Sequence, residues 1–204
     1  MRDDAGWWSL RKTSTTVPME WGHTHVTLFG TQAAMAVCPD EAPSPQITAL
    51  VFITDGALRE SIRLDISAAH RNHGEGEWKG ATVLAGSGAE ALLLWALQGQ
   101  EQKKSGMLAA AVAALLANKT LRHDPGPNPE GRDWSLHQDV EVTAHLRLIK
   151  DDTATLVRLT KDFRNLIHPG RAARAGQKCD RSTALGALAA VEAVARDLTP
   201  PQGG

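Results

Sequence analysis

Cysteine is scarce in this sequence, and its two copies are isolated. Cys38 and Cys179 lie far apart in a chain of 204 residues, and neither has a second cysteine near it. A disulfide framework or a cysteine-based zinc site requires several cysteines at short, regular spacings. The pattern therefore excludes both and is typical of the reducing cytoplasm, which is where we expect this chain to act.

The chain also has no excess of charge of one sign. Lysine and arginine together number 22 and aspartate and glutamate 23, which gives a formal net charge of −1 with neutral histidines. A protein that binds nucleic acid through its overall positive charge is therefore excluded. Any contact with nucleic acid has to come from a local basic patch.

Long hydrophobic runs are missing as well. Residues 1–22 contain acidic side chains and no continuous apolar segment, so they do not resemble a signal peptide. The most apolar segment, residues 81–97, is interrupted by glycine, serine and glutamate and is too short to span a bilayer. We expect a soluble protein with no membrane partner.

The composition changes near residue 56. Residues 1–56 hold three of the six tryptophans, four prolines and two runs of β-favouring residues, 25–31 and 47–54. We predict a small two-stranded element or a partly ordered arm here, and a gene start placed too far upstream would give the same irregular composition. With 42% hydrophobic residues overall, the chain is long enough for one sizeable core.

From residue 57 onward, apolar side chains recur every three or four residues, as in amphipathic helices. The sequence predicts an all-α bundle of five or six helices over residues 57–198 and a disordered tail over residues 199–204. The predicted helices cover residues 57–73, 77–98, 105–118, 134–149, 151–168 and 180–198, with a loop rich in proline and glycine over residues 123–133.

Cap and stop residues set the expected ends of these helices. Ser105 is expected to cap the third helix, and Asp180 or Ser182 the last one. Pro169 is expected to end the helix over residues 151–168, because proline has no N–H group and disfavours helical geometry in the residue before it. A loop should then continue as far as Asp180.

The helix expected over residues 151–168 brings two polar side chains together. Arg164 and His168 are four residues apart, so they are neighbours on one helical face. At about 100° per residue, both lie beside the apolar stripe centred on Phe163 rather than within it. Such a position is typical of a helical face that borders a cleft or a partner.

Basic side chains gather around the same segment. Between Arg158 and Arg181 the sequence has seven basic and two acidic residues. We identify Lys161, Arg171 and Arg174 as candidate phosphate-binding residues. A solvated helical face is an equally good interpretation of this run, since charge runs are usually exposed.

The segment DFRNLIHPGR, residues 162–171, carries a resemblance to a known family. Together with residues 76–97 and 179–198, it resembles bacterial helical proteins of the HEPN-like group, the higher eukaryotes and prokaryotes nucleotide-binding proteins. The resemblance covers residues 57–198. It implies a compact helical bundle that usually forms a homodimer, in which the Arg/His motifs of two subunits face one shared cleft.

Many members of the HEPN-like group are metal-independent ribonucleases that act as toxins or as effectors of anti-phage defence. The resemblance therefore implies an RNA substrate, no cofactor, and an antitoxin or defence-system protein as a partner. Other members are non-catalytic and bind nucleotides or partner proteins. Because the ribonuclease pattern has at least one more residue between arginine and histidine than the three found here, a non-catalytic binding or assembly module stays open as an alternative.

The resemblance also assigns roles to individual residues. Arg164, Asn165 and His168 are the candidate catalytic residues. His168 would act as general acid or base on the ribose 2′-hydroxyl or the leaving oxygen, Arg164 would hold the scissile phosphate, and Asn165 would orient the histidine or the phosphate. Glu90, in the apolar second helix, is a candidate partner of Arg164, because a carboxylate there needs a cation or hydrogen-bond donors.

Each role has a purely structural alternative. Arg164 and Glu90 would also be explained by an ion pair that fixes helix packing. His168 would also be explained by a helix end, where its charge complements the helix dipole, and Asn165 by a local hydrogen bond.

Two other patterns are weaker. The histidine pairs at residues 23–25 and 70–73 have no third ligand at a suitable spacing, so no metal site is expected. The segment Gly86–Gly88 lies inside an expected helix and follows no strand, which favours close helix packing over a phosphate-binding loop.

Overall fold

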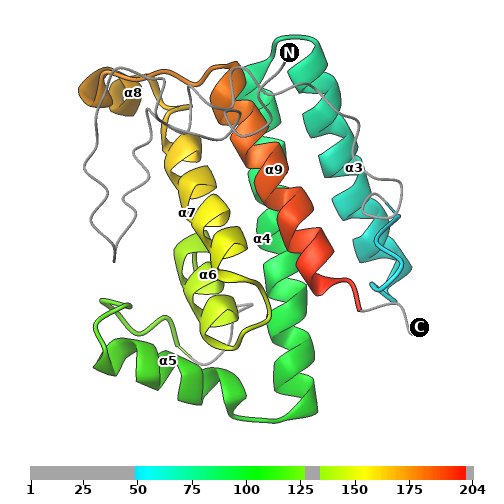
Figure 1. Ribbon diagram of the computed structural model, residues 1–204, viewed down its shortest axis with the longest axis vertical. Helices are drawn as coiled ribbons and strands as arrows, with labels where there is room; N and C mark the ends of the chain where they lie inside the picture. Colours follow the sequence, from blue (N-terminus) through cyan, green and yellow to red (C-terminus); the bar gives the residue numbers. More distant parts are fainter. Residues whose placement is uncertain (1–48, 127–133, 201–204) are drawn as a thin grey trace, which may run out of the picture.

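The structure is a computed structural model that describes residues 49–126 and 134–200. Within these ranges the chain is helical and contains no β-strand, which confirms the predicted all-α class (Figure 1). The described residues form seven helices rather than the five or six predicted. These are α3 (Gly56–Gly74), α4 (Trp78–Lys103), α5 (Met107–Ala117), α6 (Leu136–His145), α7 (Asp151–Asn165), α8 (Pro169–Ala175) and α9 (Arg181–Leu198).

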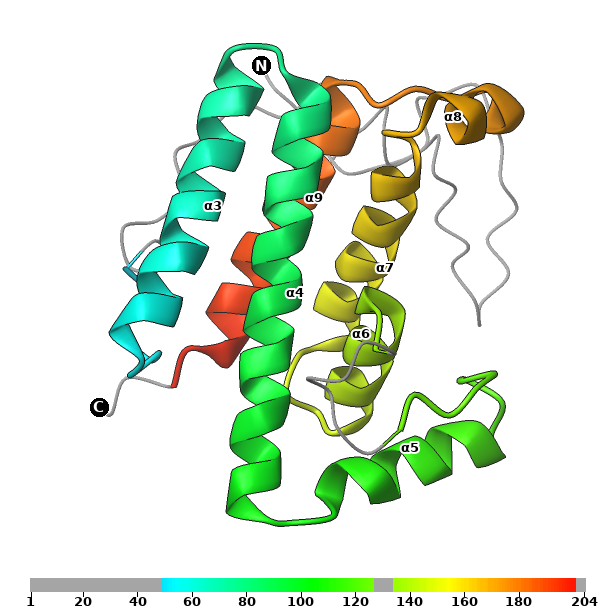
Figure 2. The same ribbon diagram turned by 180° about the vertical axis from the view of Figure 1, so that it is seen from behind.

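Helix α4 is the central element of the bundle. It packs against α3, α9, α7, α6 and α5. In Figures 1 and 2, α3, α4, α7 and α9 run side by side, α5 crosses one end of the bundle, and α8 lies at the other end. The fold therefore brings α4 and α7 into contact although they are far apart in the sequence.

The main core forms where α3, α4 and α9 meet. Ile62 and Ile66 of α3 lie four residues apart and are both buried, as the helical spacing predicts. A Cβ atom added to Gly88 of α4 would lie 3.3 Å from the Ile66 side chain and 3.4 Å from that of Val191 in α9. Gly88 thus allows three helices to approach closely at one point, which confirms the packing interpretation of the Gly86–Gly88 segment at this position.

The segment before α3 joins this core without forming a strand. The strand predicted over residues 47–54 is wrong for the described part: Leu50 has a φ of 46°, and the Ile53 N–H donates to the Leu50 carbonyl over 3.0 Å, so the chain turns. Leu50 and Ile53 are both fully buried, and the Phe52 ring lies 5.3 Å from that of Trp95. Burial of Leu50 and Ile53, three positions apart in a turn, has overridden the β propensity of this segment.

Residues 1–48 lie outside the described ranges, and so does the other predicted strand over residues 25–31. The partly ordered arm and the domain boundary at residue 56 therefore stay predictions, whereas the two-stranded element has lost the part of its second strand over residues 49–54.

A second apolar cluster occupies the end of the bundle at α5. It is formed by Leu97, Leu108, Ala111, Val112, Leu115, Leu121, Trp134 and Val142. Ser105 does not cap α5 as predicted, because the cap position is taken by Gly106 with a φ of 80°. The Glu101 carboxylate, in the last turn of α4, accepts hydrogen bonds from the N–H groups of Gly106 and Leu108 instead, and these bonds lower the pKa of Glu101. The preceding helix thus supplies the cap.

The junction of α7 and α8 explains the additional helix. Helix α7 ends at Asn165 rather than at residue 168, and Pro169 is the first residue of α8 rather than the start of a loop. The missing N–H and fixed φ of proline are tolerated in the first turn of a helix, where the N–H has no intrahelical partner. At α9, the prediction of an Asp180 cap is confirmed by its carboxylate, which accepts from the N–H groups of Ser182 and Thr183.

Helix α4 has 26 residues and is long and apolar enough, by length and composition alone, to cross a membrane. The expectation that its apolar segment is too short is therefore wrong for the helix as a whole. The central helix of a bundle passes the same test, and 56% of the most apolar window of α4 is buried against the rest of the chain.

Candidate functional site

Arg164 is held at the contact between α7 and α4. Its Nη1 donates to Oε2 of Glu90 over 2.7 Å, which is the pairing that the sequence predicted. The two side chains are 33% and 38% exposed, so the pair lies at the edge of the core and not inside it. The Arg164 stem crosses Gly86, where an added Cβ would come within 2.6 Å of Arg164 Cδ. The glycine therefore makes room for the arginine.

Asn165 connects the end of α7 to α8. Its Oδ1 accepts a hydrogen bond from Nη1 of Arg171. Asn165 is half-buried, whereas Arg171 is exposed. The candidate catalytic residue Asn165 and the candidate phosphate-binding residue Arg171 are thus brought together, and Asn165 makes the local hydrogen bond that was its alternative interpretation.

His168 lies between two helices instead of on one. It is the cap residue of α8, and its backbone carbonyl accepts from the N–H groups of Arg171 and Ala172, both over 3.0 Å. The prediction that Arg164 and His168 share a face of one continuous helix is therefore wrong, because the chain leaves α7 at Asn165. The His168 side chain is exposed and has no partner among residues 49–126 and 134–200.

The remaining basic candidates differ in their surroundings. Lys161 lies 3.6 Å from Asp162, and its side chain is 39% exposed. Arg174 is exposed on α8, a helix with no buried residue. No hydrogen bond or ion pair connects Lys161 or Arg174 to the Arg164–Glu90 pair within the described ranges, so the structure does not bring these two cations into one site with Arg164.

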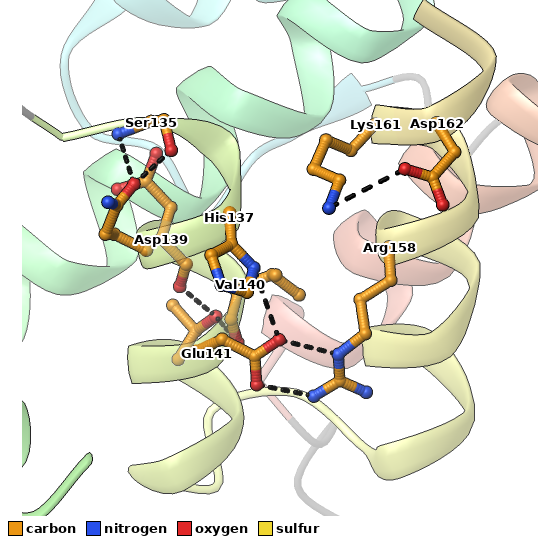
Figure 3. A network of polar contacts seen from close by, with 10 residues as sticks. Ser135, His137, Asp139, Val140, Glu141, Arg158, Lys161 and Asp162 are labelled. Atoms are coloured by element: carbon orange, nitrogen blue, oxygen red, sulfur yellow. Dashed lines mark hydrogen bonds and ion pairs between the residues drawn. The ribbon is translucent and has the colours of Figure 1, made fainter. Parts of the chain in front are cut away.

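A second ion pair joins α6 and α7 (Figure 3). Arg158 donates from Nε and Nη2 to the two carboxylate oxygens of Glu141, over 2.7 and 2.8 Å. His137 Nδ1 lies 3.6 Å from the same carboxylate. Burial lowers the pKa of His137, the Glu141 carboxylate opposes that change, and Lys161 adds to it. Sequence reasoning missed this cluster, although the spacing of four between His137 and Glu141 was a usable signal.

Asp139 is a buried acid on α6 that feels the charge of Glu90. It is only 3% exposed, and its Oδ1 has no hydrogen-bond partner in the part of the chain that the structure describes. Burial, and then the nearby Glu90 carboxylate, raise the pKa of Asp139 to about 7. This residue was also missed, although an acid three residues after Leu136 and one before Val140 falls on the apolar side of its helix.

Other parts of the described chain contribute less to a site. No group of three histidine, cysteine, aspartate or glutamate side chains comes together there in a way that could hold a metal ion. A shallow depression of about 250 Å³ lies between the α4–α5 turn and the end of α6. It contains none of the candidate site residues and is lined by Lys104, Ser105, Gly106, Met107, Ala110, Ala111, His145 and Leu146.

Comparison with known proteins adds no relative on which an assignment could rest. No family model matches the chain, and no curated protein or solved structure matches it. The resemblance to the HEPN-like group remains a prediction from residues 57–198, and a functional proposal has to be argued from the side chains just described.

Proposed function

We propose that this chain is a HEPN-like, metal-independent ribonuclease that acts as a homodimeric toxin or anti-phage effector, with Arg164, Asn165 and His168 at its reactive site. One observation carries the proposal. The imidazole of His168 is exposed and without a partner among the described residues, in the turn between Asn165 and the basic helix α8. A side chain in this state is available to a substrate, unlike the paired side chains around it.

The chemistry assigned to this turn needs no metal. His168 removes the proton of the ribose 2′-hydroxyl as its oxygen attacks the adjacent phosphorus, and the bond to the 5′-oxygen breaks when that oxygen takes up a proton. Arg164 stabilises the negative charge that develops on the phosphate. A guanidinium has five N–H donors, and Glu90 takes one of them at Nη1. The other donors leave capacity for a phosphate oxygen.

The charge around the turn supports an RNA ligand. Seven basic and two acidic residues lie between Arg158 and Arg181. Arg171 and Arg174 are both exposed on α8, which buries none of its residues, and Arg171 also donates to Asn165. Exposed cations along one segment attract the phosphates of a nucleic acid without any need for a basic chain overall.

A non-catalytic binding or assembly module is the second candidate function. It is favoured by the internal pairing of the site, since Arg164 is bound to Glu90 and Asn165 to Arg171. In such a module the two contacts fix the ends of α7 and α8, and the exposed cations bind nucleotides or a partner protein.

RNA cleavage by the purified full chain in the presence of a chelator distinguishes the two functions. We expect the wild type to degrade a labelled RNA and His168→Ala to lose about 100-fold or more of the rate, because general acid–base catalysis contributes factors of this size. His145→Ala is the matched control, since His145 is also exposed but ends α6. RNA that stays intact with the wild type would overturn the ribonuclease, and RNA that is bound but intact would favour the binding module.

A further inference from the structure

Polar side chains of α6 and α7 face each other where these two helices pack together. Residues 146–150 alone connect the helices, so α6 and α7 are antiparallel neighbours. The two hydrogen bonds from Arg158 to Glu141 fix their register. One turn further, toward the start of α6 and the end of α7, His137 and Lys161 occupy facing positions. Figure 3 shows the Arg158 and Lys161 side chains extending from α7 toward His137 and Glu141.

The two cations of this cluster keep donors that the protein does not use. Glu141 accepts from Nε and Nη2 of Arg158, so Nη1 and its two N–H groups have no acceptor among the described residues. Lys161 lies 3.6 Å from the exposed carboxylate of the next residue, Asp162, and an exposed ion pair of this kind is weak. Both cations are partly exposed, so an anion from solvent can reach them.

The His137 ring is oriented with one nitrogen inward and the other outward. Its Nδ1 is buried and lies 3.6 Å from the Glu141 carboxylate. Because 39% of the side chain is nevertheless exposed, the opposite edge of the ring, which carries Nε2, reaches solvent. A carboxylate beside one ring nitrogen fixes the ring and leaves the other nitrogen for a ligand. His137 also lies in the first turn of α6, where the helix dipole favours negative charge.

We propose that Nε2 of His137, Nζ of Lys161 and Nη1 of Arg158 form a binding site for one phosphate group. Guanidinium, ammonium and imidazolium groups are all suitable donors to phosphate oxygens, and Glu141 holds two of the three side chains in place.

The inference rests on the proposed function for the source of the phosphate, which is the backbone of an RNA substrate. Lys161 and Arg164 are three residues apart on α7, so they are neighbours on the helix surface. No contact joins them, and each therefore receives a different phosphate of the same strand. The site at α6 and α7 positions the RNA, and the cleavage step stays with His168.

The charges around His137 make binding at this site dependent on pH. The groups that act on the imidazole come from its own helix, from α7 and from the segment after α5. They are Glu141, Arg158, Lys161 and Arg122. Burial and the three cations lower the pKa of His137, and Glu141 opposes this change. A bound phosphate brings negative charge to Nε2 and raises the pKa again, so phosphate binds more strongly when His137 is protonated, at the lower pH.

The first experiment uses inorganic phosphate as the probe and the full chain. The histidine Cε1–H signals are followed by NMR between pH 5 and pH 8, in phosphate and in sodium chloride of equal ionic strength, and His137→Gln identifies the signal of His137. Its midpoint should be higher by about one pH unit in phosphate. The exposed His145, at the other end of α6, should titrate alike in both salts, and Lys161→Gln should reduce the shift of His137. Equal midpoints of His137 in the two salts would overturn the proposal.

The second experiment measures binding of a short labelled RNA by fluorescence anisotropy, in the His168→Ala background that prevents cleavage. Lys161→Gln should weaken binding and reduce the slope of log affinity against log salt by about one, as expected for the loss of one phosphate contact. Lys150→Gln is the matched control, because it removes the same charge from an exposed position at the start of α7 and should leave the slope unchanged. Equal reductions in both variants would show that only the overall charge matters and would overturn the site.

The outcomes separate this inference from the proposed function. A phosphate-dependent shift of His137, together with no RNA binding in any variant, would support the phosphate site and overturn the proposed function. RNA cleavage by the wild type, together with no shift of His137 and no effect of Lys161→Gln on RNA binding, would overturn the phosphate site and leave the ribonuclease intact.

Discussion

Arg158 and Arg164 lie on the same helix, and each binds a carboxylate of another helix, yet the two pairs differ in the number of hydrogen bonds and in the burial of the acid. Arg158 makes two hydrogen bonds to Glu141, whose side chain is 9% exposed. Arg164 makes one hydrogen bond to Glu90, whose side chain is 38% exposed. The first geometry is bidentate and engages two donors on one edge of the guanidinium, whereas the second engages a single donor.

The neighbours on α6 sharpen this contrast. Glu141 has a histidine beside it, His137, at 3.6 Å. Glu90 has a second acid beside it, Asp139, whose pKa it helps to raise. A neighbour that can carry positive charge favours the ionised form of a carboxylate, whereas a neighbouring acid disfavours it. We infer that the Arg158 pair serves the packing of α6 on α7, and that the Arg164 pair is the weaker contact of the two.

The largest effect is expected from Asp139→Asn on the free energy of unfolding. The folded-state pKa of about 7 lies above the ordinary value of 3.8, so the stability contributed by the proton is present below about pH 4 and is lost as the pH rises through 7. Relative to the variant, the wild type should lose on the order of 4 kcal/mol between pH 4 and pH 8. Urea unfolding at both values measures the difference, and a constant difference would contradict the prediction.

A smaller effect is expected when the first pair is broken. Arg158→Met should lower the free energy of unfolding by about 3 kcal/mol, because the buried Glu141 carboxylate loses both of its donors. Arg164→Met should lower it by only about 1 kcal/mol, because water can reach the exposed part of Glu90. Equal losses in the two variants, measured by urea unfolding, would remove the distinction between the pairs.

The smallest effect comes from two glycines of α4. Gly99→Ala should raise the free energy of unfolding by up to about 1 kcal/mol, because no atom lies within 4 Å of the added Cβ and alanine is the better helix former. Gly86→Ala should give no gain, because its Cβ would lie 2.6 Å from Arg164 Cδ and displace the arginine from Glu90. Thermal unfolding of both variants tests this, and equal gains would show that Arg164 has room to move.

The helices were predictable because their signals are local. The spacing of Ile62 and Ile66, and the Asp180 cap, depend on residues a few positions apart. The α7–α8 junction was not predicted, because Pro169 is compatible with both a helix end and a helix start, and the backbone around His168 decides between them. The turn at Leu50 and Ile53 was missed because burial in the core outweighs the β propensity of these residues.

The candidate site was predictable in part for the same reason. The rule that a carboxylate in an apolar helix needs a cation was enough to pair Glu90 with Arg164. Which carboxylate Arg158 binds, and which acid lies beside Glu90, depends on how α6 packs against α4 and α7. That packing involves residues far apart in the sequence, so neither Glu141 nor Asp139 could be assigned to its neighbours beforehand.

Helix α4 also fixes the spacing between contacts at its two ends. Near one end of the helix, Arg164 packs over Gly86 and binds Glu90. Near the other end, Leu97 belongs to the apolar cluster around α5, and Glu101 accepts hydrogen bonds from the first residues of α5. With a rise of 1.5 Å per residue, Gly86 and Glu101 are about 22 Å apart along one rigid axis. One residue inserted between them would rotate everything beyond it by about 100°. The register of this single helix therefore determines whether the Arg164 pair and the α5 end of the bundle form together.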